Sequence, residues 1–90
     1  MPDKTRHLKM VVACHDSNGC PTFVPLKAKA TDEDVLFGDH YWTAKDWVTD
    51  NGYEEPLVCF DEQDCNAQQV PLLDSFDWDE APIVDVRKRL

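Results

Sequence analysis

Alternating hydrophobic and polar positions predict two antiparallel strands in the first third of the chain. Residues 8–14 form a mostly apolar run with β-branched residues at its centre, which is typical of a buried strand. Residues 22–30 alternate, and the apolar face consists of Val24, Leu26, Ala28 and Ala30. Between the two runs, Asn18-Gly19 tolerates the positive φ of a tight turn. We expect a hairpin whose second strand lies at a sheet edge, because Pro25 cannot donate a hydrogen bond to a neighbouring strand.

Helical periodicity follows the second strand. The segment from Thr31 to Asp34 predicts a capped helical turn that Gly38 ends, and the main helix is expected over about 39–51, with Asp39 as its N-cap and Gly52 after its end. At 100° per residue, the inward stripe and its flanks contain His40, Tyr41, Ala44, Trp47 and Val48. The opposite side contains Asp39, Thr43, Asp46 and Asp50, with Trp42 beside them.

The second half of the chain predicts less regular structure. Residues 57–60 favour a third strand, residues 61–69 a polar loop, and residues 83–86 a marginal fourth strand. We therefore expect an α+β fold, a small mainly antiparallel three- to four-stranded sheet with one principal helix (about 39–51) on one face, in the order β-β-α-β(-β). Residues 1–90 are expected to form a single domain with a flexible segment at 1–6 and an acidic-aromatic tail at 72–90.

Charge is distributed very unevenly along this sequence. Residues 30–86 contain sixteen of the eighteen acidic residues and one basic residue, Lys45, for a local net charge of −15. Such a segment repels nucleic acid and anionic membranes and attracts basic protein surfaces. No apolar run is long enough to span a membrane, and the run at residues 10–13 is too short for a signal peptide, so we expect a cytoplasmic protein. The alternative interpretation is that the charge serves solubility alone.

The acidic segment predicts a site for a basic protein partner, in which carboxylates attract and aromatic residues anchor. The expected partner-binding residues are Asp39, Trp42, Asp46, Asp50, Asp61, Glu62, Asp77, Trp78, Asp79 and Glu80. A competing interpretation is that Phe76 and Trp78 fold back to complete the core. We expect a non-enzymatic interaction protein; a narrower hypothesis is mimicry of nucleic acid towards a DNA- or RNA-binding protein, as in some small inhibitors encoded by mobile elements. An accessory subunit without a specific acidic site is an alternative.

Four cysteines form two pairs with equal spacing. Cys14 and Cys20 enclose five residues, as do Cys59 and Cys65. Four thiolates can hold zinc tetrahedrally, although these gaps are wider than those of ordinary zinc knuckles. A metal- or redox-responsive domain is therefore an alternative function, and free structural thiols or disulfides are the other two interpretations of the cysteines.

Known catalytic and cofactor motifs do not occur in the sequence. It contains no P-loop, Gly-rich dinucleotide fingerprint, G-x-S-x-G or H-E-x-x-H motif. Asp77-Trp78-Asp79 begins like a calcium-binding loop, but no turn glycine and no closing glutamate follow. We expect no catalytic residues and no cofactor, with zinc at the four cysteines as an alternative.

Overall fold

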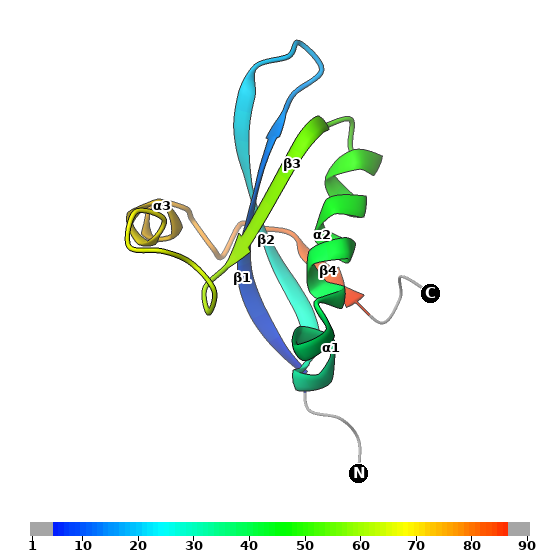
Figure 1. Cartoon of the computed structure of the whole chain (residues 1–90), viewed down its shortest axis with the longest axis vertical. Helices are drawn as coiled ribbons and strands as arrows, with labels where there is room; N and C mark the ends of the chain where they lie inside the picture. Colours follow the sequence, from blue (N-terminus) through cyan, green and yellow to red (C-terminus); the bar gives the residue numbers. More distant parts are fainter. Residues whose placement is uncertain (1–4, 87–90) are drawn as a thin grey trace.

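The computed structural model describes residues 5–86, which form a mixed sheet with three helices (Figure 1). In chain order the elements are β1 (Thr5–His15), β2 (Pro21–Thr31), α1 (Asp32–Phe37), α2 (Asp39–Asp50), β3 (Glu54–Asp61), α3 (Val70–Asp74) and β4 (Ile83–Asp85). The α+β class, the principal helix and the expected order are confirmed. Of the segment 1–6, residues 1–4 lie outside the described part of the chain, while Thr5 and Arg6 belong to β1.

The β1–β2 hairpin is the central piece of the sheet. Its strands are paired from Thr5 opposite Thr31 to His15 opposite Pro21. The connecting turn is held by Asp16, whose carboxylate accepts hydrogen bonds from the backbone N–H groups of Asn18 and Cys20. Gly19 adopts a φ of 80°, the conformation that the Asn-Gly pair predicts.

The sheet has the strand order β3-β1-β2-β4, and it is mixed because β4 runs parallel to β2. The expectation that β2 forms a sheet edge is wrong for Lys27–Lys29, which pair with β4. Pro25 lies before this pairing begins, so its missing N–H takes nothing from the β2–β4 ladder.

Local capping explains the two consecutive helices. Thr31 and Asp34 form a reciprocal capping box at the start of α1, in which each side chain accepts from the other residue's backbone N–H. Gly38, with a φ of 77°, ends α1 and is also the N-cap of α2, a position expected for Asp39. The prediction that Thr43 faces outward is wrong. Its side chain is buried, and its hydroxyl donates to the backbone oxygen of Asp39, which satisfies the buried polar group.

The two faces of the sheet carry separate cores. Helix α2 packs on one face, against alternate β1 and β2 residues such as Leu8, Met10 and Leu26. On the other face, the chain around α3 packs Leu73 against Val11 and Phe60. Helices α2 and α3 therefore lie on opposite sides of the sheet (Figure 1).

Candidate functional site

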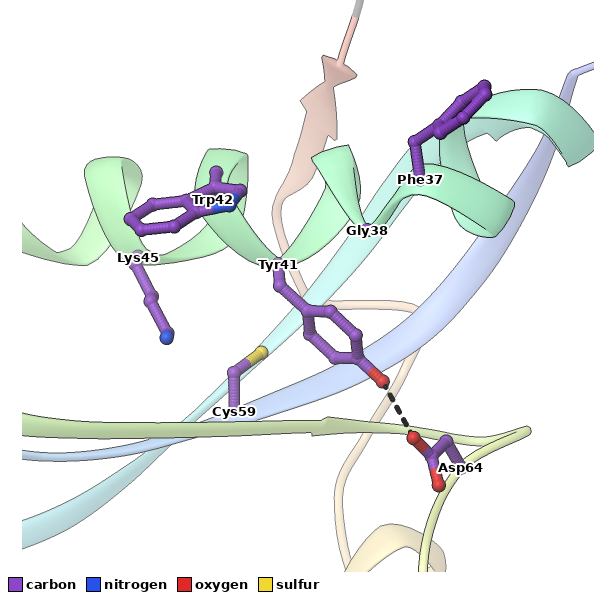
Figure 2. Close-up of a pocket in the computed structure, with 7 residues that line it drawn as sticks. All are labelled: Phe37, Gly38, Tyr41, Trp42, Lys45, Cys59 and Asp64. Carbon is purple, nitrogen blue, oxygen red and sulfur yellow. Dashed lines mark hydrogen bonds between the residues drawn. The ribbon is translucent and has the colours of Figure 1, made fainter.

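A cleft opens where α1 meets α2 above the end of β3 (Figure 2). Its volume is about 400 Å³, and we call it the aromatic cleft. The lining residues are Phe37, Gly38, Tyr41, Trp42, Lys45, Cys59 and Asp64. Tyr41 reaches down from α2 towards Asp64, in the loop that follows β3, whereas Lys45 extends from α2 further along the same side of the cleft (Figure 2).

A neighbouring cavity of about 320 Å³ shares Phe37, Gly38, Tyr41 and Asp64 with this cleft. The tyrosine ring lies 4.1 Å, centroid to centroid, from the His40 ring, and its hydroxyl donates to Asp64 Oδ2 across 3.3 Å. Burial and the nearby Asp61 and Asp64 carboxylates raise the pKa of Tyr41 well above its ordinary value. The hydroxyl therefore stays protonated and remains a hydrogen-bond donor to Asp64.

A buried pair lines the neighbouring cavity. His40 and Asp61 are each 1% exposed, and His40 Nε2 lies 2.8 Å from Asp61 Oδ2. The other carboxylate oxygen of Asp61 accepts from the backbone N–H groups of Gln63 and Asp64, at 2.9 and 2.6 Å. Burial alone would raise the pKa of Asp61, but the hydrogen bond from His40, those from the backbone N–H groups of Asp64 and Gln63, and the nearby Tyr41 hydroxyl outweigh it and leave the pKa below the ordinary value.

This balance fixes the charge of Asp61 and the direction of its hydrogen bond with His40. Asp61 is ionised at neutral pH, so it only accepts hydrogen bonds, and His40 Nε2 carries the hydrogen that it donates to Asp61. His40 Nδ1 is buried and has no hydrogen-bond partner among the described residues.

Large apolar side chains are exposed around the mouth of the cleft. Leu36 is 80% exposed, Phe37 68% and Trp42 58%. Asp39 and Asp46, on α2, are exposed beside them. The ammonium group of Lys45 lies 5.4 Å from the centroid of the Trp42 ring, which is within the range of a cation–π contact. The region therefore combines exposed aromatic surface, carboxylates and the ammonium group of Lys45.

The predicted partner-binding residues do not form one surface. Asp39, Trp42, Asp46 and Asp50 are exposed on α2, on one side of the sheet. The tail lies on the other side, where Asp77, Asp79 and Glu80 are exposed. Trp78 is half-buried there: its indole N–H donates to the backbone oxygen of Leu73 at 2.7 Å, and its ring packs with Phe76.

Two of the loop acids serve the fold itself. The assignment of Asp61 to a partner surface is wrong, because its side chain is buried and bound to His40. Period-2 alternation could have found it: Leu57 and Cys59 face α2, and extending β3 by two residues places Asp61 on the same face. Glu62 remains exposed, but its carboxylate accepts from the backbone N–H of Lys9 at 2.8 Å.

The four cysteines do not converge. Cys14 is buried in the core beneath α2, and Cys59 packs against that core, whereas Cys65 packs on the opposite core and Cys20 is exposed at the hairpin turn. All four thiols are free. Within residues 5–86, no group of three or more His, Cys, Asp or Glu residues is arranged to hold a metal ion. The structure therefore does not support the shared zinc site that the equal spacing suggested.

Comparison of the chain with protein-family models, with curated proteins and with solved structures finds no match. In the described part of the chain, no helix has both the length and the apolar character needed to cross a membrane. The function of the cleft therefore has to be argued from its own residues.

Proposed function

We propose that this protein is a non-enzymatic interaction protein that binds a basic protein surface through the α1–α2 side of the fold. The observation that carries the proposal is the exposure of Leu36, Phe37 and Trp42 beside the carboxylates of α2. Contiguous exposed apolar side chains rimmed by polar groups mark interaction sites, because solvent exposure of such surface is unfavourable. In this proposal the apolar side chains supply the buried anchor and the carboxylates select a cationic partner.

The position of Asp50 supports a role for the acids of α2. Asp50 is in the last turn of α2, which contains no basic residue. The partial negative charge at a helix C-terminus disfavours a carboxylate there, so helix stability does not explain this residue. An aspartate at this position is consistent with selection for a negative surface.

Nucleic-acid mimicry would need a continuous row of carboxylates, and the described acids are divided between the α2 side and the tail side. We therefore propose that the α1–α2 side alone binds the partner, and that the partner presents a basic protein surface. The four free thiols suit a reducing compartment, and we place the proposed interaction in the cytoplasm.

Two variants with the same change in net charge test the proposal. The first, Asp39→Asn/Asp46→Asn/Asp50→Asn, removes three charges from α2, and the control, Asp74→Asn/Asp79→Asn/Glu80→Gln, removes three exposed charges from the tail side. Tagged wild-type and variant proteins would capture partners from native lysate at increasing salt, with quantification by mass spectrometry. We expect the α2 variant to lose about tenfold or more of a basic partner that the control retains.

Equal losses in both variants would mean that net charge, rather than the α2 side, attracts the partner. Unchanged capture by the α2 variant would favour an accessory subunit whose acids serve solubility. Binding that is insensitive to salt would also contradict the proposal, since interactions between exposed charges weaken as salt screens them. The single variant Trp42→Ala, with all carboxylates retained, tests the apolar anchor separately.

A further inference from the structure

The β1–β2 hairpin has the opposite charge to the rest of the described chain. Residues 5–31 contain four basic residues and one acid, whereas residues 32–86 contain sixteen acids and one basic residue. Of the four bases in the hairpin, Arg6 is paired with Asp32 at 3.3 Å. The other three are Lys9, Lys27 and Lys29. None of these lysines forms a salt bridge with a carboxylate of residues 5–86, so their ammonium groups are available to carboxylates of another molecule.

The three lysines lie on the face of the sheet opposite α2. Their neighbours along β1 and β2 are buried beneath α2, and alternation along a strand places the lysine side chains on the other face. Lys9 is directly opposite Lys27 in the hairpin register, and Ile83 of β4 is paired with Lys27 on its other side. The Ile83 side chain is 53% exposed. We call Lys9, Lys27, Lys29 and Ile83 the lysine face.

The stability of the sheet does not explain the lysine face. Like charges directly opposite each other on neighbouring strands are destabilising, and Lys9 and Lys27 are such a pair. The Lys9 ammonium group lies 5.7 Å from the centroid of the Trp78 ring, within the range of a cation–π contact. The exposed acids of the tail lie on the same side of the sheet, but within residues 5–86 none of them forms a salt bridge with a lysine. A cationic surface that opposes stability is consistent with selection for binding.

From these two surfaces we infer that the basic partner of the α1–α2 side is a second copy of this chain, so the inference rests on the proposed function. The acids of α2 meet the lysine face of the next copy, and the two surfaces are complementary in charge. Each also has exposed apolar side chains, which are Leu36, Phe37 and Trp42 on the α1–α2 side and Ile83 on the lysine face.

The contact is head-to-tail, because the two surfaces lie on opposite sides of the sheet (Figure 1). Each pair of molecules leaves one acidic α1–α2 side and one lysine face unused at its ends. A contact between two different surfaces of the same chain adds further copies unless the rotation closes a ring. The protein should therefore form oligomers whose size increases with concentration.

Repulsion between two copies with a net charge of −9 does not exclude this contact. At an ionic strength of 0.15 M the Debye length is about 8 Å. The shortest extent of the molecule is 23 Å, so the centres of two stacked copies are separated by roughly three Debye lengths. Charges that touch across the interface lie within one Debye length. Salt therefore screens the repulsion between the net charges more than the attraction between the two surfaces.

Sedimentation velocity of the purified protein tests the inference. In 0.15 M NaCl we expect the weight-average mass to rise from 10.3 kDa at low concentration to at least about twice that value near 500 µM. In 1 M NaCl, where the Debye length is about 3 Å, the mass should stay near that of the monomer.

Two variants each remove one half of the contact. The variants are Asp39→Asn/Asp46→Asn/Asp50→Asn and Lys9→Gln/Lys27→Gln/Lys29→Gln. Each should remain monomeric alone, whereas an equimolar mixture should form a heterodimer and nothing larger, because the remaining acids and the remaining lysines can meet only once. One variant loses three negative charges and the other loses three positive charges, so the mixed pair has the same total charge as two wild-type molecules. Pairing in the mixture also shows that both variants are folded.

The tail-side variant Asp74→Asn/Asp79→Asn/Glu80→Gln is the control, since it changes the net charge as the α2 variant does and should associate like the wild type. A wild-type protein that stays monomeric near 500 µM, or a mixture that does not pair, would overturn the inference. Equal loss of association in the tail-side and α2 variants would overturn it as well.

Failure of this inference is distinguishable from failure of the proposed function. If the protein stays monomeric but the α2 acids are needed to capture a basic partner from lysate, the proposed function stands and the second copy is wrong. If the lysine variant loses association and the α2 variant retains it, the lysine face binds another surface and the proposed role of the α2 acids is wrong. If the protein stays monomeric and the α2 acids affect no captured partner, both are wrong.

Discussion

At the scale of single residues, the His40–Asp61 pair joins α2 to the end of β3. Both side chains are 1% exposed, and the carboxylate also accepts two backbone N–H groups of the following loop. The pair therefore holds three elements of the α1–α2 side together: the helix, the strand end and the loop that contains Asp64. Removing one partner of such a pair is costly, because the other is left buried without compensation.

Asp61 should make the stability of the protein depend on pH in the acid range. The folded-state pKa of Asp61 is below the ordinary value, so ionised Asp61 contributes to the free energy of unfolding. This contribution is complete above the unfolded-state pKa of about 4, and it is lost as the pH falls through the folded-state pKa. Asp61→Asn should lower the free energy of unfolding at pH 7 by about 2 kcal/mol and flatten its pH dependence below pH 4. His40, Tyr41 and Asp64 face the same carboxylate and stay unchanged in this comparison.

Urea unfolding between pH 2.5 and pH 7 would measure both effects. The matched control is Asp74→Asn, an exposed carboxylate, which should change the free energy of unfolding by less than about 0.5 kcal/mol. A variant at position 61 that keeps the wild-type pH dependence would show that other carboxylates dominate acid unfolding.

The cysteines should differ strongly in reactivity. Desolvation in its half-buried position raises the pKa of the Cys59 thiol to about 12, and Cys14 is buried, with its pKa raised by burial and by Asp16. Since the thiolate is the reactive form, neither should react with iodoacetamide at pH 8 in the folded protein, whereas the exposed Cys20 should. Mass mapping of the modified peptides, with and without urea, measures this. Fast modification of Cys59 in the folded state would contradict the raised pKa of its thiol.

At the scale of elements, α2 has one acid at each end, and the two should have opposite effects on stability. Asp39 is in the first turn, where the helix dipole favours a negative charge, and Asp50 is in the last turn, where it does not. We expect Asp50→Asn to stabilise the protein and Asp39→Asn to destabilise it, each by about 0.3–1 kcal/mol at low ionic strength. Chemical denaturation of the two single variants, which change net charge equally, provides the comparison; the same sign for both would exclude the dipole as the cause.

The elements of this fold were predictable because their signals are local. Alternation identifies β2, the Asn-Gly pair identifies the turn, and the Thr31–Gly38 caps identify α1. The parallel pairing of β4 with β2 was not predictable, because a three-residue strand carries no signal of its direction.

The site was predictable only in part. Exposure of Trp42 follows from helical periodicity, but the cleft depends on how α2 lies over β3, which no local pattern specifies. Asp61 was assigned to the surface because an acid at a strand end is usually solvated, and its burial depends on a histidine 21 residues earlier. The exposed Leu36 and Phe37 were missed because α1 has six residues and none is fully buried, so helical periodicity could not identify its exposed side.

At the scale of the whole molecule, exposed acids lie on both sides of the sheet, whereas three lysines of the hairpin lie on the side of the tail. The acids of α2 lie on one side, whereas Lys9, Lys27 and Lys29 alternate with residues buried beneath α2 and so project from the other face. The net charge of −9 nevertheless leaves the acids in excess. Self-repulsion of that excess opposes the compact state. The three lysines offset part of it on the tail side, whereas α2 contains one basic residue, Lys45, so the α2 side contributes more of the repulsion.

Screening should therefore stabilise the protein. Raising NaCl from 10 to 500 mM should raise the melting temperature on the order of 5 °C, equivalent to about 1 kcal/mol for a domain of this size. The Asp39→Asn/Asp46→Asn/Asp50→Asn variant should show a smaller rise, because part of the repulsion has already been removed, and the tail-side triple variant should respond more nearly as the wild type does. Differential scanning calorimetry of the three proteins measures this.

If all three respond equally, general salt effects on apolar burial explain the rise instead. If the α2 variant responds least, the acids of α2 reduce folding stability, and a bound basic partner would relieve the same repulsion that salt screens.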